Sequence, residues 1–423
     1  MKASPRQLMN LRRNCCGKND RRAETKTINS WELAHNRLHM LISIGRTPEN
    51  EISNINLYNK EKNMTSKQFL KRFFIGSGAL LLLCILIVVV IDPFFQYHKA
   101  LPGLKAVLAD KEYQVVGTLK NFDYDSVVAG SSVAENYNNS WFDEGFNCHV
   151  IKAIRSYGAT ADLCYLLDEA FEHQQLKYVF YNLDPSALVA DPEPTFELTG
   201  CPMYLYDNNY INDIQYVLNK GVLFEKIPYM IAKSVTGDYN EDESYNWAQW
   251  KEFNSDMALG LYIRKPSIAE EKPEDAYQEL LSRNLELLTS RIEAHPETEF
   301  YIFMPPYSML WWDSTYRDGD LNAYLYNMET AMNTLLEYEN VRCFYFMNNR
   351  ETILNLENYM DILHFSDEIN HQICNDLIDG KFEVTKENCH EVIEDMRSLA
   401  DEIVTKLILP YEDRIKFDLV DEE

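Results

Sequence analysis

Short apolar runs alternate with longer amphipathic stretches along most of the chain after residue 120. The runs with the length of a strand cover 126–129, 149–154, 177–183, 299–304 and 341–346. Stretches with apolar positions three and four residues apart predict helices over 161–173, 273–294, 321–338, 366–378 and 392–409. Strands that alternate with helices in this way predict an α/β fold with a parallel sheet covered on both faces.

Residues 186–270 interrupt this alternation, because they are aromatic and acidic and contain only short helical pieces near 210–218 and 222–234. We interpret them as an insertion into one domain that covers 99–415. The last residues, 416–423, are predicted to be an acidic tail.

One apolar run is much longer than the others. Residues 73–91 contain no charged side chain, and about 20 apolar residues span a bilayer as a helix. Lys67, Lys71 and Arg72 precede the run and Asp92 follows it. The positive-inside rule then predicts a single-pass membrane anchor over 64–98, with a cytoplasmic N-terminus and an extracellular C-terminal domain. A cleaved signal peptide is the alternative, although no small-x-small cleavage site follows the run.

Charge changes sign at the same boundary. Residues 1–72 hold 15 Lys/Arg and 6 Asp/Glu, a net charge of +9, whereas the remainder holds 25 and 60, a net charge of −35. A domain this acidic is a poor binder of nucleic acid. The polar, basic residues 1–63 predict a disordered segment, and Met64 opens a stretch typical of a signal-anchor start, so the preceding residues are expected to be dispensable.

The cysteine pattern supports no zinc site, because none of the nine cysteines forms a Cys-x-x-Cys pair. Six of them lie in the predicted outer domain, where disulfides can form, and their redox state stays open. The histidines at 149, 173, 364, 371 and 390 leave a metal-dependent hydrolase as a weaker alternative. No motif indicates a cofactor.

Two short motifs about 230 residues apart carry the candidate chemistry. The first is an apolar strand that ends in Gly130-Ser131-Ser132, which can present a hydroxyl beside free backbone N–H groups. The second is Asp361-x-x-His364, in which the carboxylate can orient the imidazole so that it accepts a serine proton. Each motif alone also fits an ordinary turn or loop.

Other polar and aromatic residues follow predicted strands, where parallel sheets place their sites. Asn182 and Gly158 can donate hydrogen bonds to an oxyanion, and Asp184 can contact substrate. Tyr307, Trp311 and Trp312 can stack on sugar rings if they are exposed, or pack in the core if they are not.

The ordered set of motifs resembles the SGNH/GDSL hydrolase superfamily over residues 120–380, especially membrane-anchored bacterial members of the cell envelope. The resemblance implies a flavodoxin-like three-layer α/β/α fold and a catalytic triad of Ser132, His364 and Asp361. It also implies oxyanion donors at Ser132, Gly158 and Asn182. Ser131 replaces the usual Asp of the first block, as in D-alanyl-lipoteichoic acid transfer proteins. The third block lacks its Gly-x-Asn-Asp form, so either Asn182 or Asp184 holds that position.

The resemblance and the anchor together predict a membrane-bound serine esterase or O-acyltransferase. Its expected substrate is an acylated cell-envelope glycan or teichoic acid, and a membrane acyl-transfer protein is a candidate partner. Water as the second substrate gives hydrolysis, whereas a sugar hydroxyl gives transfer. The alternative is an inactive protein of the same fold that binds glycan or a partner.

Overall fold

The computed structural model describes residues 65–196 and 200–417. The predictions for residues 1–63 and for most of the acidic tail therefore lie outside the described residues. The chain divides into two compact units, Met1–Leu81 and Leu82–Glu423. The boundary between these units falls inside helix α4 (Ser66–Ile91). Residues 92–98 belong to the second unit, where the Asp92 carboxylate is buried and accepts backbone hydrogen bonds from Gln96, Tyr97 and His98.

Helix α4 is long and apolar enough to cross a membrane, by its length and composition. It has 26 residues, and most of its large apolar side chains are exposed. A core helix of this composition would instead be buried against its own domain. The helix predicted from residues 73–91 is therefore confirmed, and its orientation across a membrane stays a prediction.

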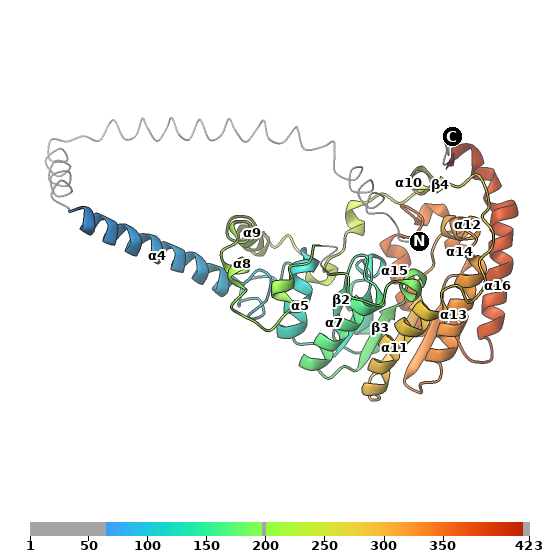
Figure 1. Ribbon diagram of the computed structural model, residues 1–423, viewed down its shortest axis with the longest axis horizontal. Coiled ribbons are helices and arrows are strands. Elements are labelled where there is room, and N and C mark those ends of the chain that lie inside the picture. The colour runs from blue at the N-terminus through green and yellow to red at the C-terminus, as the bar shows by residue number, and fades with distance from the viewer. Residues whose placement is uncertain (1–64, 197–199, 418–423) are drawn as a thin grey trace. The chain divides into compact units, whose positions relative to one another are not determined.

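The second unit is built on a mostly parallel six-stranded sheet (Figure 1). Its strands lie in the order β2 (Val150–Ile154), β1 (Ser126–Gly130), β3 (Tyr178–Asn182), β5 (Glu299–Met304), β6 (Val341–Tyr345) and β7 (Glu383–Val384). Neighbouring strands from β2 to β6 are parallel, and β7 pairs antiparallel with β6. The strand order reverses at β1, because β2 lies on one side of it and β3 lies on the other. Such a point is where open parallel sheets place their sites.

Helices cover both faces of the sheet, which agrees with a three-layer α/β/α architecture. Helices α7 (Thr160–His173), α11 (Gln278–Ala294) and α13 (Leu321–Leu335) contact one another in one layer. Helices α6 (Asn139–Phe146) and α15 (Asp367–Asp379) contact each other in the other layer.

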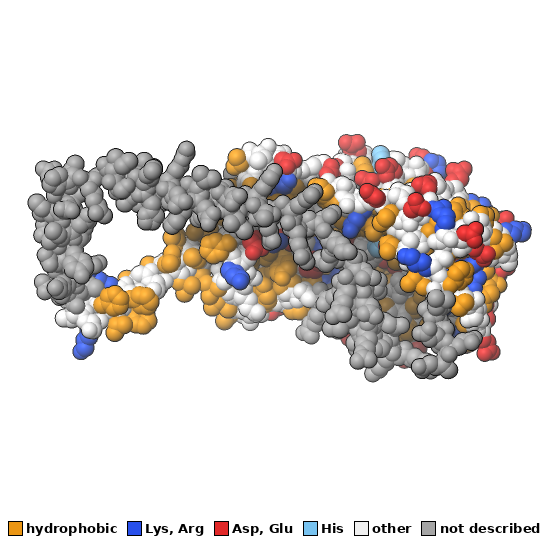
Figure 2. All heavy atoms as spheres, turned by 90° about the horizontal axis from the view of Figure 1, so that it is seen from above, with side chains coloured by type: hydrophobic (Ala, Val, Ile, Leu, Met, Phe, Trp, Pro, Cys, Tyr) orange, Lys and Arg blue, Asp and Glu red, His pale blue; other side chains and the backbone are white. Residues whose placement is uncertain are grey.

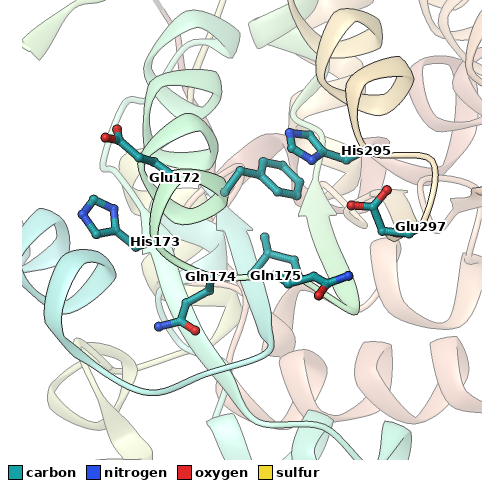
Figure 3. A pocket seen from close by; sticks show the side chains of 8 residues that line it. Glu172, His173, Gln174, Gln175, His295 and Glu297 are labelled. Carbon is teal, nitrogen blue, oxygen red and sulfur yellow. The ribbon is translucent and has the colours of Figure 1, made fainter.

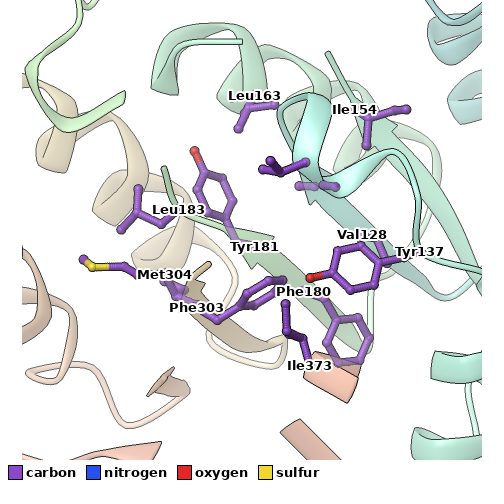
Figure 4. Close-up of a cluster of buried hydrophobic side chains, with 14 of the residues drawn as sticks. Val128, Tyr137, Ile154, Leu163, Phe180, Tyr181, Leu183, Phe303, Met304 and Ile373 are labelled. Carbon is purple, nitrogen blue, oxygen red and sulfur yellow. The ribbon is translucent and has the colours of Figure 1, made fainter. Parts of the chain in front are cut away.

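Consecutive strand residues point to these two layers in turn. Figure 4 shows Tyr181 on the side of Leu163, whereas Phe180 lies on the side of Tyr137 and Ile373. Aromatic side chains pack between the sheet and the layer of α6 and α15. The Phe142 ring of α6, for example, lies 4.6 Å from the Phe180 ring of β3.

Most predicted strands and helices are confirmed within a few residues. Helix α11 begins at Gln278 and not at residue 273, because a turn precedes it. The sequence analysis missed α6, which has only eight residues, and strand β7, which has two. It also missed α5 (Lys111–Asn121) and α12 (Met309–Arg317).

The 186–270 insertion lies in the connection between β3 and β5, ahead of α11, and its described residues add no strand to that sheet. It contains α8 (Ile214–Val217), the π-helical turn η5 (Val222–Lys226), α9 (Ile227–Thr236), α10 (Ser255–Leu261) and β4 (Ile263–Arg264). Strand β4 pairs in parallel with β8 (Lys416–Phe417), so the tail predicted from residue 416 begins as a strand.

The remaining elements lie in connections and at the C-terminal end. They are the 3-10 turns η1 (Ser132–Ala134), η2 (Pro185–Val189), η4 (Met203–Leu205), η6 (Glu241–Glu243), η7 (Ala248–Trp250), η8 (Leu356–Asn358) and η10 (Leu409–Arg414), helices α14 (Arg350–Ile353) and α16 (Cys389–Glu402), and the π-helical turn η9 (Ile403–Leu407).

The surface and the thiols reflect the composition of the second unit. Many Asp and Glu side chains are visible on the face that Figure 2 shows, in keeping with the strong acidic excess of this part of the chain. All seven cysteines of the described part are free, so the six cysteines that follow α4 form no disulfide in this structure.

Candidate active site

The end of β1 brings the first motif to the carboxyl edge of the sheet. A Cβ on Gly130 would lie 2.6 Å from the Ala134 Cβ and 2.8 Å from the Asn182 Cβ, distances that real side chains do not adopt. Glycine is therefore required here by the close approach of β3 and of the turn η1. The chain then turns at Ser131, and Ser132 begins η1.

The second motif meets Ser132 at this edge. The Ser132 Oγ and the His364 Nε2 lie 2.8 Å apart, and the His364 Nδ1 lies 2.7 Å from the Asp361 Oδ2. Serine hydrolases use a hydroxyl, an imidazole and a carboxylate in this order. The predicted contact across 232 residues is present, and the catalytic role of the three side chains stays a prediction.

The loop that carries His364 is fixed by its own carboxylate. The Asp361 Oδ1 accepts the backbone N–H groups of Leu363 and His364 at 2.8 and 2.7 Å. The Met360 N–H donates to the His364 carbonyl oxygen at 3.0 Å, which closes the loop. The imidazole is therefore held before any substrate arrives, and its side chain is 20% exposed.

The electrostatics of the pair suit a general base. Burial acts to lower the pKa of His364, but the hydrogen bond and the charge of Asp361 raise it above its ordinary value, with smaller contributions from Glu135 and Asp184. Burial acts to raise the pKa of Asp361, and the hydrogen bond and charge of His364 lower it below its usual range. The carboxylate is thus ionised at neutral pH, ready to stabilise an imidazolium.

Asp184 lies behind the serine turn and does not face solvent. It accepts hydrogen bonds from the Tyr307 hydroxyl at 2.6 Å, from the Asn182 Nδ2 at 3.0 Å and from the Ser131 hydroxyl. Burial raises its pKa, which these hydrogen bonds oppose. The geometry gives Asp184 a supporting role that joins the ends of β1, β3 and β5, in place of the substrate contact predicted for it.

The predicted oxyanion donors differ in availability. The Ser132 N–H donates no hydrogen bond within the described part of the chain. The Asn182 Nδ2 donates one of its two hydrogens to Asp184, and the other has no acceptor within the described residues, although Asn182 is fully buried. The Gly158 N–H, however, donates to the Arg155 carbonyl oxygen at 3.0 Å, in a turn whose Tyr157 has a φ of 59°. The expectation of a free donor at Gly158 therefore does not hold in this conformation.

A buried ionic cluster holds the turn that contains Ser156, Tyr157 and Gly158. The Glu135 Oε1 accepts the Ser156 hydroxyl at 2.6 Å, and its other oxygen pairs with Lys111 at 2.6 Å. Lys152 donates to the backbone carbonyls of Glu135 and Ser244, and burial lowers its pKa to about 7. These contacts join four separate segments of the chain, represented by Lys111, Glu135, Lys152 with Ser156, and Ser244.

Trp247 is a site residue that the sequence analysis missed. Its Nε1 donates to the Ser132 carbonyl oxygen at 3.2 Å, and its ring meets the His364 ring edge-on at 5.2 Å. Asn136 holds the Trp247 backbone N–H at 3.1 Å. Trp247 belongs to the insertion, and an aromatic cluster there (Tyr245–Trp250) was the only signal in the sequence.

Of the two alternatives left open for the aromatic residues after β5, the structure shows core packing. Tyr307 and Trp311 are buried, and Trp312 has no exposed surface at all. The reason is that α12 starts directly after β5 and turns both indoles inward, with the Trp311 ring 5.5 Å from the Tyr324 ring of α13. These residues pack the core and are unable to stack on a sugar.

Neither of two surface hollows of the second unit includes the triad. One, of about 390 Å³, is lined by side chains that include His173, His295 and Glu297, at the end of α7 and the turn before β5 (Figure 3). The other, of about 530 Å³, lies between α7 and α11 and includes Arg283 and Arg291. Within the described residues, no group of three or more His, Cys, Asp or Glu side chains can hold a metal ion.

No protein-family model and no curated protein matches this chain. The residues themselves must therefore carry any functional conclusion. They present an activated hydroxyl, an oriented base and at least one unengaged backbone donor at a sheet edge, which together can perform acyl transfer through a covalent intermediate.

Proposed function

We propose that this chain is a membrane-anchored serine esterase or O-acyltransferase of the SGNH type. The observation that carries the proposal is the continuous hydrogen-bonded path from the Ser132 Oγ through His364 to Asp361. The strand order supports it too, because β2-β1-β3-β5-β6 is the order of flavodoxin-like sheets. In addition, Ser132 follows the strand at which the order reverses.

In the proposed reaction the Ser132 Oγ attacks the carbonyl carbon of an ester while the His364 Nε2 takes its proton. The tetrahedral oxyanion is stabilised by the Ser132 N–H and by the second N–H of Asn182. His364 then protonates the leaving alkoxide as the ester bond breaks, which leaves an acyl-serine. Water or a sugar hydroxyl attacks this intermediate in turn, with His364 again as base, so that Ser132 is regenerated.

The substrate class follows from location. Helix α4 is suited to hold the domain at a membrane, and the resemblance is to anchored envelope proteins. An acylated envelope glycan or teichoic acid outside the cell, served by a membrane acyl-transfer partner, is therefore the proposed substrate. The strong negative charge of the domain favours a neutral or cationic one, such as an ester that carries an amino group.

A fluorophosphonate probe tests the proposal on the full chain in detergent. Such a probe reacts with a serine only when a base activates it, so the wild-type chain should be labelled at Ser132. Ser132→Ala should lose the label. Ser131→Ala is the matched control, because the neighbouring hydroxyl is bonded to Asp184 and not to His364, and it should keep the label. Equal labelling of wild type and Ser132→Ala would remove Ser132 from the mechanism.

The second candidate is an inactive binding protein with the same fold. The engaged N–H of Gly158 favours it, since an oxyanion site with one donor fewer typically loses about 10²–10³ in kcat. A folded wild-type chain that the probe leaves unlabelled, and that turns over no ester, would decide for this candidate.

A further inference from the structure

The segment 210–235 of the insertion exposes an unusual amount of apolar surface. Exposure reaches 86% for Ile211, 81% for Val235 and 72% for Phe224. We call the whole set the 210–235 surface. Besides two tyrosines it consists of Ile211, Ile214, Leu218, Phe224, Ile231 and Val235. Soluble domains rarely leave an apolar patch of this kind in water.

The spacing of these residues places them on one side of each helix. Ile214 and Leu218 lie four residues apart, as do Ile231 and Val235. The other side of each helix is already packed, since Tyr216 of α8 and Met230 of α9 are buried in the domain. The exposed side is therefore a second apolar face for which the described residues supply no cover.

This surface is fixed to the chain that leaves α4. The Tyr216 hydroxyl donates to the Asp92 Oδ1 at 2.7 Å, and Asp92 is the residue directly after the helix. The Tyr97 hydroxyl donates to Asp213 at 3.0 Å. On α9, the Ser234 Oγ accepts the Lys105 N–H at 2.8 Å. Both helices are thus held beside the exit point of a segment that can cross a membrane.

Charge distinguishes the same segment from the rest of the domain. Residues 210–235 hold three Lys and two acidic residues, a net charge of +1, and Asp213 is buried. The chain from residue 73 onward holds 25 Lys/Arg against 60 Asp/Glu. Helices that lie on a bilayer combine an apolar face with lysines that reach toward the headgroups, and Lys220 is exposed in this way.

We propose that the 210–235 surface lies in the headgroup region of the bilayer that α4 crosses, as a second membrane contact of the same domain. Interfacial helices bury their apolar face about 5–10 Å below the headgroups. The contact would fix the orientation of the domain, whereas α4 alone provides only a tether. The proposal does not depend on the catalytic function.

Photo-crosslinking to lipid tests this on the full chain in phosphatidylcholine vesicles. Part of the lipid carries a diazirine in its acyl chain, and adducts are mapped on peptides after irradiation. We expect adducts on α4, the positive control, and on peptides that cover 210–235. The control surface is Leu261, Ile263 and Ile268, which are also exposed and apolar but lie near α10 and β4, and it should remain free.

Adducts on α4 but not on 210–235 would overturn the proposal, and so would equal adducts on the control surface. A second copy of the chain seated on this surface would exclude lipid and give the first of these negative results. The double variant Phe224→Asp, Val235→Asp should lose the 210–235 adducts while keeping those on α4. Because both side chains are exposed, its thermal unfolding and its labelling by the fluorophosphonate probe should match wild type.

Discussion

Two segments at the carboxyl ends of strands β1 and β5 each contain a serine, but the two serines make different contacts. After β1 the chain continues as Gly130-Ser131-Ser132, and after β5 as Pro305-Pro306-Tyr307-Ser308. The first presents the Ser132 hydroxyl to His364. The second is buried and holds the histidine loop, because the Ser308 hydroxyl donates to the Ile362 carbonyl oxygen at 2.9 Å and the Tyr359 hydroxyl to that of Pro306 at 2.6 Å. The segment after β1 holds the candidate nucleophile, and the segment after β5 holds the loop that contains His364.

The largest expected effect concerns the candidate nucleophile after β1. Asp361→Asn keeps the size of the side chain but removes the charge that orients and stabilises the imidazolium. If the proposed function holds, ester turnover by the full chain should fall by about 10⁴-fold, the loss known for the same change in an established Ser-His-Asp triad. A loss below tenfold, with an unchanged unfolding temperature, would show that His364 does not act through Asp361.

The pH profile sharpens the same test. His364 works as a base only when it is neutral, and its pKa lies above the ordinary histidine value. Wild-type activity should therefore rise with pH through a midpoint above about 6.5. The residual activity of Asp361→Asn should have its midpoint at lower pH, because the partner that raises the pKa is gone. Equal midpoints would contradict the assignment.

A change just after β5 should act on stability first. Trp312→Ala removes a fully buried indole, and such changes typically cost about 3–5 kcal/mol. Chemical denaturation of the full chain in detergent should show this loss. Well below the new midpoint, probe labelling at Ser132 should stay close to wild type. Lost labelling in a chain that is still folded would place Trp312 in the site.

The smallest effect is expected where the insertion touches the serine. Trp247→Phe keeps a ring beside His364 but removes the hydrogen bond from the Nε1 to the Ser132 carbonyl, which is worth about 1 kcal/mol. Turnover should fall by less than about tenfold, since 1.4 kcal/mol corresponds to a factor of ten. Trp250→Phe, which changes an exposed indole of the same loop, is the control and should have no effect.

Sequence reasoning worked where the pattern is local. The strands that become β1, β3 and β5 are largely apolar runs, and the Gly at the end of β1 and the Asn at the end of β3 are visible without coordinates. The Asp361-x-x-His364 spacing was enough to predict the carboxylate–imidazole contact. The approach of His364 to Ser132 was expected only from the resemblance to the SGNH/GDSL superfamily, because no pattern in the residues places the second motif beside the first.

The remainder depends on contacts between distant segments. Whether Trp312 is exposed is set by the packing of α12 against its neighbours, which its own sequence does not specify. The engagement of the Gly158 N–H depends on a left-handed Tyr157, a conformation for which a tyrosine gives no signal. Trp247 reaches the site only because Asn136 and Lys152 hold the insertion against the sheet.

The insertion therefore has a consequence for anyone who wishes to shorten this protein. The insertion looks removable, because β3 and β5 are adjacent strands and α11 alone could serve as the crossover between them. Deleting it would nevertheless remove Trp247, which contacts Ser132. It would also remove the Ser244 carbonyl oxygen, which accepts a hydrogen bond from the buried Lys152 ammonium group. A shortened chain would need a replacement for both contacts to keep the Ser132 site as it is.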